Sequence, residues 1–283
     1  MSLLQDWHTH NSLCRHATGI LDDYARRAIA LNLDLIGFSD HFPYEFLQGI
    51  EGIPYEEYGM PLDEIEMYIS TIERLKSNYE EEIEIKIGFE LDFIQLQADA
   101  HKKYLNQYIE RLDYILGSVH ILEGKTGFFA FDDSRFLKNY DLYGSIEDLY
   151  LDYYTTLQNM VNSPDFNFNI ISHLDLPKKF NRRPVISELI ENQVLKTLEL
   201  VKKEDLVIEI NTSGLRKPIK EQYPSETILR KMYELDIPIL LGSDAHHPDE
   251  LGFEFRNIIK LVKKIGYNQL AYFNKRRMLS VEI

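Results

Sequence analysis

The chain has 283 residues, of which 44% are hydrophobic and 27% are charged. This is the composition of an ordinary globular protein, and it excludes long disordered tracts, collagen and an extended coiled coil. The excess of acidic over basic residues gives a formal net charge of −15. So acidic a chain is poorly suited to general binding of nucleic acid or anionic membranes.

Cysteine usage and hydropathy both favour a cytoplasmic protein. The single cysteine, Cys14, excludes an internal disulfide framework and fits a reducing compartment. Residues 1–10 lack the basic and apolar regions of a signal peptide, and no apolar run approaches the ~18 residues of a membrane span. No linker or internal repeat divides the chain, which predicts one domain over residues 1–283 and leaves the oligomeric state open.

Short apolar runs, rich in Ile, Leu, Val and Phe, recur along the whole chain. Such runs are typical of parallel strands that are buried on both faces. In chain order the predicted strands are Leu3–Trp7, Leu35–Ser39, Ile83–Glu90, Leu112–Val119, Phe168–Ser172, Leu206–Ile210 and Ile237–Gly242.

Longer amphipathic segments with helical spacing lie between these runs. The clearest predicted helices cover residues 21–29, 62–72, 146–161, 186–198, 228–235 and 253–265. A polar helical stretch over 99–111 carries His101, which we expect to be solvated. Seven strand-then-helix units predict a barrel-like or doubly wound α/β fold.

Histidines stand at or just past the carboxyl ends of most of the predicted strands. Glu90 ends the third strand, and Asp244 follows the seventh. Because the carboxyl ends of parallel strands converge on one face, these side chains are expected to line one pocket. Imidazoles and carboxylates are the usual protein ligands of zinc, manganese and iron. The candidate ligands are His8, His10, His16, His41, Glu90, His120, His173, Asp244 and His246.

The pair His8 and His10 is the sharpest local element. On an extended segment, residues i and i+2 point to the same side, so both imidazoles can reach one ion. The candidate ligands outnumber what one ion can use, which indicates two or three divalent ions, Zn, Mn or Fe. Glu90 is the natural carboxylate to bridge them.

Each candidate also has a plainer explanation when taken alone. His16 and His41 could be loop histidines bonded to backbone carbonyls, and His120 and His173 could be core histidines. Glu90 could belong to a structural ion pair, since a buried carboxylate needs a cation or strong donors. Asp244 could cap a helix. The combination of all nine favours the metal interpretation.

The motifs in combination resemble the PHP (polymerase and histidinol phosphatase) superfamily, and within it the stand-alone histidinol-phosphate phosphatases. The resemblance runs from His8 to His246 and rests on His8-Thr9-His10, Cys14-Arg15-His16-Ala17, Ser39-Asp40-His41, Gly88-Phe89-Glu90, Gly117-Ser118-Val119-His120, Ser172-His173-Leu174-Asp175 and Gly242-Ser243-Asp244-Ala245-His246. It implies a distorted (β/α)7 barrel with a trinuclear metal site.

The resemblance also implies how the ligands are grouped. The first ion would be held by His8, His10, Glu90 and Asp244. The second would be held by Glu90, His120 and His173, and the third by His16, His41 and His246.

The expected activity is hydrolysis of L-histidinol phosphate to L-histidinol and phosphate, a step of histidine biosynthesis. A metal-bridging hydroxide would attack phosphorus, because clustered divalent ions activate water and neutralise phosphate oxygens. The partner is then a small phosphate ester, with no nucleic acid and no membrane. The main alternative is a phosphoesterase acting on nucleotides or oligonucleotides. The remaining alternatives are an amidohydrolase-like enzyme and a non-catalytic, metal-stabilised domain.

Substrate-handling residues are less well defined by the sequence. The basic cluster Lys178, Lys179 and Arg182 follows the fifth strand and would bind phosphate, unless it is a solvated surface patch. Asp40, His247 and Asp175 are candidates for the acid that protonates the leaving group.

Three further expectations concern buried and rim residues. Glu209, inside the sixth strand, is expected in a buried polar network. Rim carboxylates, including Asp132 and Asp133, would attract a cationic amine, and Tyr44 is among the aromatic side chains that would flank an imidazole.

Overall fold

The computed structural model describes residues 3–50, 53–94, 100–124, 127–185 and 187–283. Within these residues the centre of the molecule consists of parallel strands. They are β1 (Gln5–Asp6), β2 (Leu35–Phe38), β3 (Glu84–Ile87), β4 (Glu90–Asp92), β5 (Leu116–Ser118), β8 (Ile170–Ile171), β9 (Val207–Asn211) and β10 (Ile239–Gly242).

Two parallel sheets join to close a barrel. One has the order β1-β2-β3 and the other the order β10-β9-β8-β5-β4. At one seam Trp7 N donates to Leu241 O at 3.0 Å, so β10 returns to β1. At the other seam the chain passes directly from β3 to β4 through Gly88 and Phe89. β3 pairs with β2, whereas β4 pairs with β5, so this continuous segment joins the two sheets. Since β3 and β4 form one interrupted strand, these contacts arrange the parallel strands as a distorted ring of seven, and the predicted α/β fold is confirmed.

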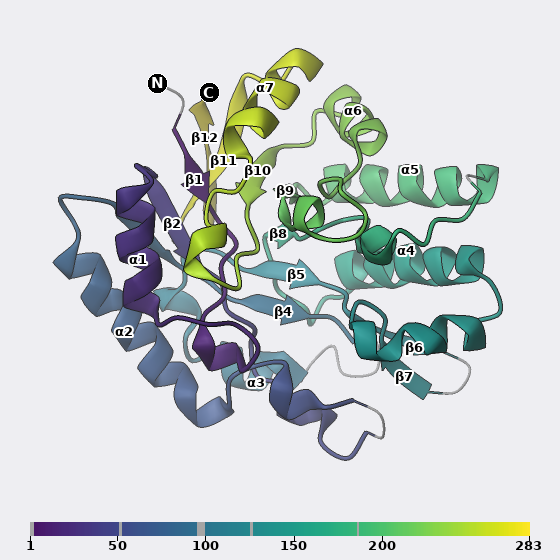
Figure 1. Cartoon of the computed structure of the whole chain (residues 1–283), viewed down its shortest axis with the longest axis horizontal. Helices are drawn as coiled ribbons and strands as arrows, with labels where there is room; N and C mark the ends of the chain where they lie inside the picture. Colours follow the sequence, from purple (N-terminus) through teal and green to yellow (C-terminus); the bar gives the residue numbers. More distant parts are fainter. Residues whose placement is uncertain (1–2, 51–52, 95–99, 125–126, 186) are drawn as a thin grey trace.

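Helices surround these strands, and Figure 1 shows α1 and α2 on one side of the barrel and α4 and α5 on the other. Their apolar faces are buried; Ile69 in α2 and Leu198 in α5 are completely inaccessible. No helix in the described part of the chain is long and apolar enough to cross a bilayer. The helices are α1 (Leu21–Ala30), α2 (Ile65–Asn78), α3 (Ala100–Leu105), α4 (Ile146–Asn162), α5 (Glu188–Lys203), α6 (Glu226–Glu234) and α7 (Phe255–Ile265).

Most strands are shorter than the apolar runs that predicted them. Leu112 and Ile115 precede β5 yet are completely buried. An apolar run reports burial rather than hydrogen-bonded pairing, so it extends beyond the regular ladder. The helix predicted from residue 186 begins at Glu188, and Ile186 lies outside the described residues.

Two antiparallel hairpins were not predicted from the sequence. They are β6 (Ile121–Gly124) with β7 (Gly127–Ala130), and β11 (Gln269–Asn274) with β12 (Arg277–Glu282). The second turns through Lys275 and Arg276, both with left-handed φ of 48° and 64°. Such turns are usually recognised by Asn-Gly or Asp-Gly, and this one has neither.

The C-terminal hairpin closes the barrel at the end opposite the histidines. Phe273 of β11 packs edge-on against Trp7, with ring centroids 6.1 Å apart. Trp7 in turn packs against Tyr114, and both belong to an apolar cluster with Leu35 and Val207, the first residues of β2 and β9. This plug leaves the carboxyl ends of the strands as the open face.

Candidate metal centre

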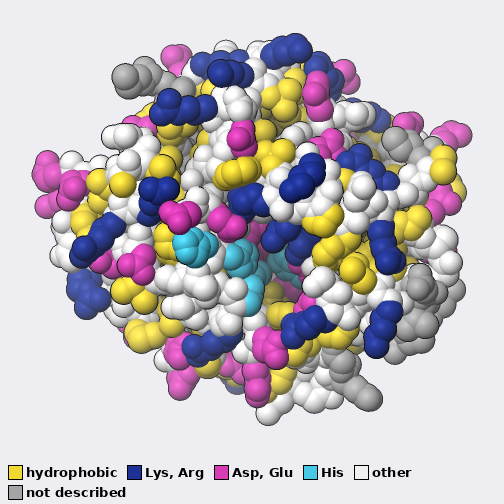
Figure 2. Space-filling view, in the orientation of Figure 1, with side chains coloured by type: hydrophobic (Ala, Val, Ile, Leu, Met, Phe, Trp, Pro, Cys, Tyr) yellow, Lys and Arg dark blue, Asp and Glu magenta, His cyan; other side chains and the backbone are white. Residues whose placement is uncertain are grey.

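A cavity of about 550 Å³ opens at the carboxyl ends of the barrel strands. Figure 2 shows histidines at the bottom of a hollow whose rim carries both acidic and basic side chains. Five histidines line the cavity, and the completely buried His8 and His10 adjoin them. The structure thus brings together all nine residues that the sequence singled out as ligands.

Glu90, at the start of β4, lies at the centre of the cluster and is 1% exposed. Ser118 Oγ donates to Glu90 Oε1 at 2.5 Å. Burial by itself would raise the pKa of the Glu90 carboxyl, but the charges of His8, His41 and His120 hold that pKa well below its usual range. The imidazole nitrogens nearest to its two oxygens belong to His173 at 3.0 Å, His8 and His41 at 3.2 Å, His10 at 3.4 Å and His120 at 3.6 Å.

His8 and His10 face each other in a way that requires a cation between them. Their Nε2 atoms are 3.0 Å apart. His8 Nδ1 lies 2.8 Å from Glu209 Oε1 and His10 Nδ1 lies 3.3 Å from Asp40 Oδ1, so each Nδ1 carries the ring proton. Neutral rings would then point two lone pairs at each other, and only a proton or a metal ion can relieve that repulsion.

The same demand for a cation appears in the pKa values. Burial alone would lower the pKa of His10, but hydrogen bonds to Asp244 and Asp40 and the Glu90 charge raise it to about 9. Burial likewise opposes protonation of His120, yet the charges of Glu90 and two aspartates raise its pKa to about 10. Without a metal ion, protons would therefore occupy the imidazole nitrogens of these two histidines.

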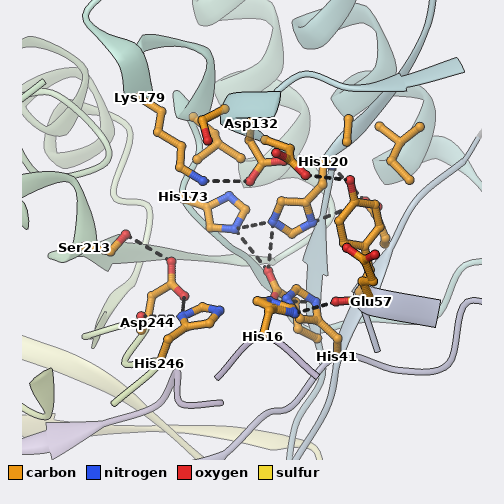
Figure 3. Close-up of a pocket in the computed structure, with 18 of the residues that line it drawn as sticks. His16, His41, Glu57, His120, Asp132, His173, Lys179, Ser213, Asp244 and His246 are labelled. Atoms are coloured by element: carbon orange, nitrogen blue, oxygen red, sulfur yellow. Dashed lines mark hydrogen bonds and ion pairs between the residues drawn. The ribbon is translucent and has the colours of Figure 1, made fainter. Parts of the chain in front are cut away.

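His16, His41 and His246, labelled in Figure 3, form a second group of imidazoles, and the rings of His41 and His246 stack against His10. His16 Nδ1 donates to the carbonyls of Cys14 at 2.8 Å and Glu57 at 2.9 Å, and His246 Nδ1 donates to Asp244 O at 3.1 Å. Burial lowers the pKa of all three rings, and His10 lowers it further. Neutral rings with protonated Nδ1 atoms leave Nε2 of His16 and His246 free to bind an ion.

The spacing of the donor atoms fits ligands that share an ion. Metal–ligand bonds of about 2.0–2.2 Å place neighbouring donors roughly 3.0–3.5 Å apart. His10 Nε2 is 3.3 Å from Asp244 Oδ1 and 3.4 Å from Glu90 Oε2. Imidazole nitrogens and carboxylate oxygens suit zinc, manganese and iron. The residues therefore fit several divalent ions, with Glu90 placed to serve more than one.

A buried polar network holds these candidate ligands in place, as expected for Glu209. Its Oε1 accepts from His8, while its Oε2 accepts from His173 N at 3.0 Å and Asn211 Nδ2 at 3.1 Å. Asp40, expected as a proton donor, also belongs to this network. It accepts from Asn11 Nδ2 at 2.5 Å and faces His10, and it does not line the cavity.

His247, the second candidate acid, also lies away from the cavity. Its side chain is 54% exposed, and its Nδ1 accepts from Asp249 N where the chain turns into a short 3-10 helix. Neither Asp40 nor His247 is therefore positioned to protonate a leaving group inside the cavity.

The structure separates the three basic candidates. Lys178 is buried, and its Nζ is tied to Asp175 Oδ2 at 2.8 Å and to Gln222 O at 2.7 Å. Arg182 lies over the ring of Tyr140, at 5.0 Å, outside the cavity lining. Lys179 alone lines the cavity, because a 3-10 helix over Leu176–Phe180 turns successive side chains in different directions.

Lys217 lines the cavity but was missed from the sequence. It is half-buried, just past the 3-10 helix Ser213–Arg216 that follows β9, and its ammonium group forms no hydrogen bond or ion pair with another described residue. Lys179, by contrast, donates to Asp132 at 2.9 Å (Figure 3). Burial lowers the pKa of Lys217, and Lys179 lowers it further. Its position after a predicted strand end was the available signal.

The expectation that His101 is solvated was wrong. Its side chain is buried, and Nε2 donates to Asp92 O at 2.8 Å. It packs edge-on against Phe46, and burial lowers its pKa to about 4. The prediction failed because the residues around His101 are mostly polar, although His101 itself occupies an inward-facing position on α3.

A model of the PHP domain matches residues 6–213 of the chain. Two curated relatives are similar over nearly the whole length. A "Probable histidinol-phosphatase" of Deinococcus radiodurans is 34% identical, covering 98% of this chain and 99% of the relative. A histidinol-phosphatase of Bacillus subtilis is 27% identical, covering 90% and 98%.

Two solved structures share the fold. A histidinol phosphatase candidate from Listeria monocytogenes superposes with a TM-score of 0.84 at 29% identity, covering 89% of this chain and 99% of that one. Histidinol phosphate phosphatase from Lactococcus lactis, solved with zinc, L-histidinol and phosphate, has a TM-score of 0.78 at 20% identity and covers 99% and 100%.

Changing Glu90 to Gln should remove metal from two positions at once, because both oxygens of this carboxylate face groups of imidazoles. Elemental analysis of protein purified without chelator measures the loss. Glu199→Gln, at an exposed position on α5, is the matched control and should keep wild-type metal content. Wild-type metal content in Glu90→Gln would contradict a shared carboxylate.

Zinc affinity should rise with pH between about pH 6.5 and 8.5. Because the metal-free pKa values of His10 and His120 are raised to about 9 and 10, both rings carry protons throughout this range and must release them to bind metal. The affinity should increase about tenfold per pH unit for each displaced proton. Titration of metal-free protein against a competing chelator measures it, and a flat profile would count against these ligands.

Proposed function

The chain belongs to the PHP domain family, and we propose that it hydrolyses L-histidinol phosphate to L-histidinol and phosphate, a step of histidine biosynthesis. The similarity to histidinol-phosphatases extends over nearly the full length of both chains, which supports this assignment within the family. The observation that carries it is the cavity itself, in which imidazoles, unmatched positive charge and carboxylates face one small volume.

We propose that nine side chains hold two or three ions of zinc, manganese or iron. When bound, such ions supply positive charge for the phosphate oxygens and lower the pKa of water. The three groups are His8, His10, Glu90 and Asp244; Glu90, His120 and His173; and His16, His41 and His246. Their support is the short donor spacing and the orientation of the Nε2 atoms described above.

Lys179 and Lys217 are the proposed phosphate ligands of the chain. Both line the cavity, and they lie close enough for each charge to act on the other. Asp132 holds Lys179 by an ion pair, whereas the ammonium group of Lys217 forms no ion pair with a described residue. A phosphate dianion would supply one, through charge-assisted hydrogen bonds from both ammonium groups.

The cationic end of histidinol would lie toward the other wall of the cavity. Asp133 and Glu57 are there, bridged by Arg135 at 2.7 Å and 2.5 Å, together with Tyr44 and Tyr58. This wall offers carboxylates for an amine and aromatic rings for an imidazole. A channel for single-stranded nucleic acid would instead need a continuous basic groove with stacking platforms.

We further propose that the chain acts as one catalytic domain in the cytoplasm. The family match ends at residue 213, but Asp244 and His246 reach the same cluster from the loop after β10. The single cysteine is buried and has no disulfide partner.

Metal-reconstituted enzyme should prefer L-histidinol phosphate over p-nitrophenyl phosphate and nucleoside monophosphates by at least ~10² in kcat/KM. That ratio corresponds to about 2.7 kcal/mol of differential transition-state binding. Steady-state assays with a panel of phosphate esters measure it. Comparable rates on a nucleotide or a short single strand would favour the alternative activity.

Lys217→Met should lower kcat/KM for histidinol phosphate by about 10- to 100-fold, mainly through KM, because a charged hydrogen bond to phosphate contributes about 1.5–3 kcal/mol. Lys196→Met, at an exposed position on α5, is the control and should retain wild-type kinetics. An unchanged KM in Lys217→Met would remove this lysine from the proposed phosphate site.

A further inference from the structure

The loop after β10 carries two of the proposed ligands, Asp244 and His246, in a backbone conformation that needs support. Asp244 has a left-handed φ of 51°. A non-glycine residue in that region is held there by its surroundings rather than by its own preference. The contacts that hold this loop therefore decide where both ligands point.

Arg216, at the end of the 3-10 helix after β9, supplies such contacts. Its Nη2 donates to Ser243 O at 2.8 Å and to Asp244 O at 3.1 Å. One guanidinium nitrogen thus binds two successive carbonyls of the ligand loop. Its planar group also lies 5.4 Å from the ring centroid of Phe253, which restricts its orientation.

Glu250 completes the arrangement from the far end of the same loop. Glu250 Oε1 lies 3.2 Å from Arg216 Nε, and Glu250 Oε2 accepts from His246 N at 2.9 Å. Asp244 O, which accepts from Arg216, also accepts from His246 Nδ1 at 3.1 Å. That bond favours the tautomer of His246 with its proton on Nδ1, which leaves the lone pair of Nε2 for the ion.

We propose that Arg216 and Glu250 are a pair of positioning residues that hold Asp244 and His246 in their metal-binding geometry. The inference rests on the proposed function only in taking these two residues as metal ligands. Arg216 does not line the cavity, whereas its neighbour Lys217 does. In this proposal Arg216 holds the loop after β10, whereas Lys217 binds the substrate.

Zinc titration of metal-free protein tests this pair without any substrate. Arg216→Met keeps much of the side-chain stem and removes the guanidinium, and it should raise the Kd of the most weakly bound zinc by about 10- to 100-fold. Glu250→Gln keeps an acceptor for His246 N, so its Kd should rise in the same direction and by less. Excess zinc should restore kcat in both variants, with KM unchanged.

Two variants provide the comparison. Lys217→Met should show the opposite split, with wild-type zinc affinity and a raised KM. Arg230→Gln, in an exposed ion pair on α6, should change neither quantity.

Wild-type zinc affinity in both Arg216→Met and Glu250→Gln would overturn the proposal, as would a raised KM at saturating zinc in Arg216→Met. If Arg216→Met does not fold, Glu250→Gln decides by the same two measurements. The two proposals can fail separately. If the variants bind zinc more weakly but the wild-type protein does not hydrolyse histidinol phosphate, the proposed function is rejected and the role of Arg216 and Glu250 is upheld.

Discussion

The structure depends on one buried carboxylate, that of Glu90. A carboxylate with 1% exposure loses nearly all of its hydration, and an uncompensated charge of this kind costs several kcal/mol. Compensation comes from Ser118 on β5 and from imidazoles that several other strands deliver to the same point. The closed barrel is what makes this possible, because residues far apart in the chain, such as Glu90 and His173 at a separation of 83 positions, meet at its carboxyl end.

Around Glu90, a layer of carboxylates fixes the imidazoles from behind. Glu209 holds His8, and Asp40 holds His10. The packing is close enough to dictate a glycine: a Cβ at Gly242 would overlap Glu209 Oε1 and crowd His8 Cβ. The glycine that opens the Gly-Ser-Asp-Ala-His segment is therefore required by this contact, and a larger residue there would displace the carboxylate that orients His8.

Sequence reasoning located the cluster because it needed only topology. Parallel strands converge at their carboxyl ends, so a histidine after most of the predicted strands was enough to bring His8, His120 and His173 together. It did not separate Lys178 from Lys179, since neighbouring residues in a 3-10 helix point in different directions and only coordinates reveal which one meets Asp175. Nor did it find the Lys275–Arg276 turn, whose left-handed conformations carry no glycine or asparagine. The hydrophobic pattern specifies which strands and helices form and where they end, whereas the direction of a single polar side chain depends on its partners.

The remaining unmatched charge indicates where the chemistry occurs. Elsewhere in the cavity cations are paired: Arg15 with Glu64, Arg135 with Glu57, and Lys179 with Asp132. Lys217 is half-buried beside Lys179, has no such partner in the described chain, and its pKa is lowered by burial and by that neighbour. The facing Nε2 atoms of neutral His8 and His10 are also electrostatically unfavourable, because their lone pairs repel each other. Both arrangements reduce the stability of the protein alone, and a cation between the histidines and an anion at the lysine would relieve them together. A metal-bound phosphate ester has this pair of charges, so the charge distribution at this end of the barrel is complementary to the proposed substrate.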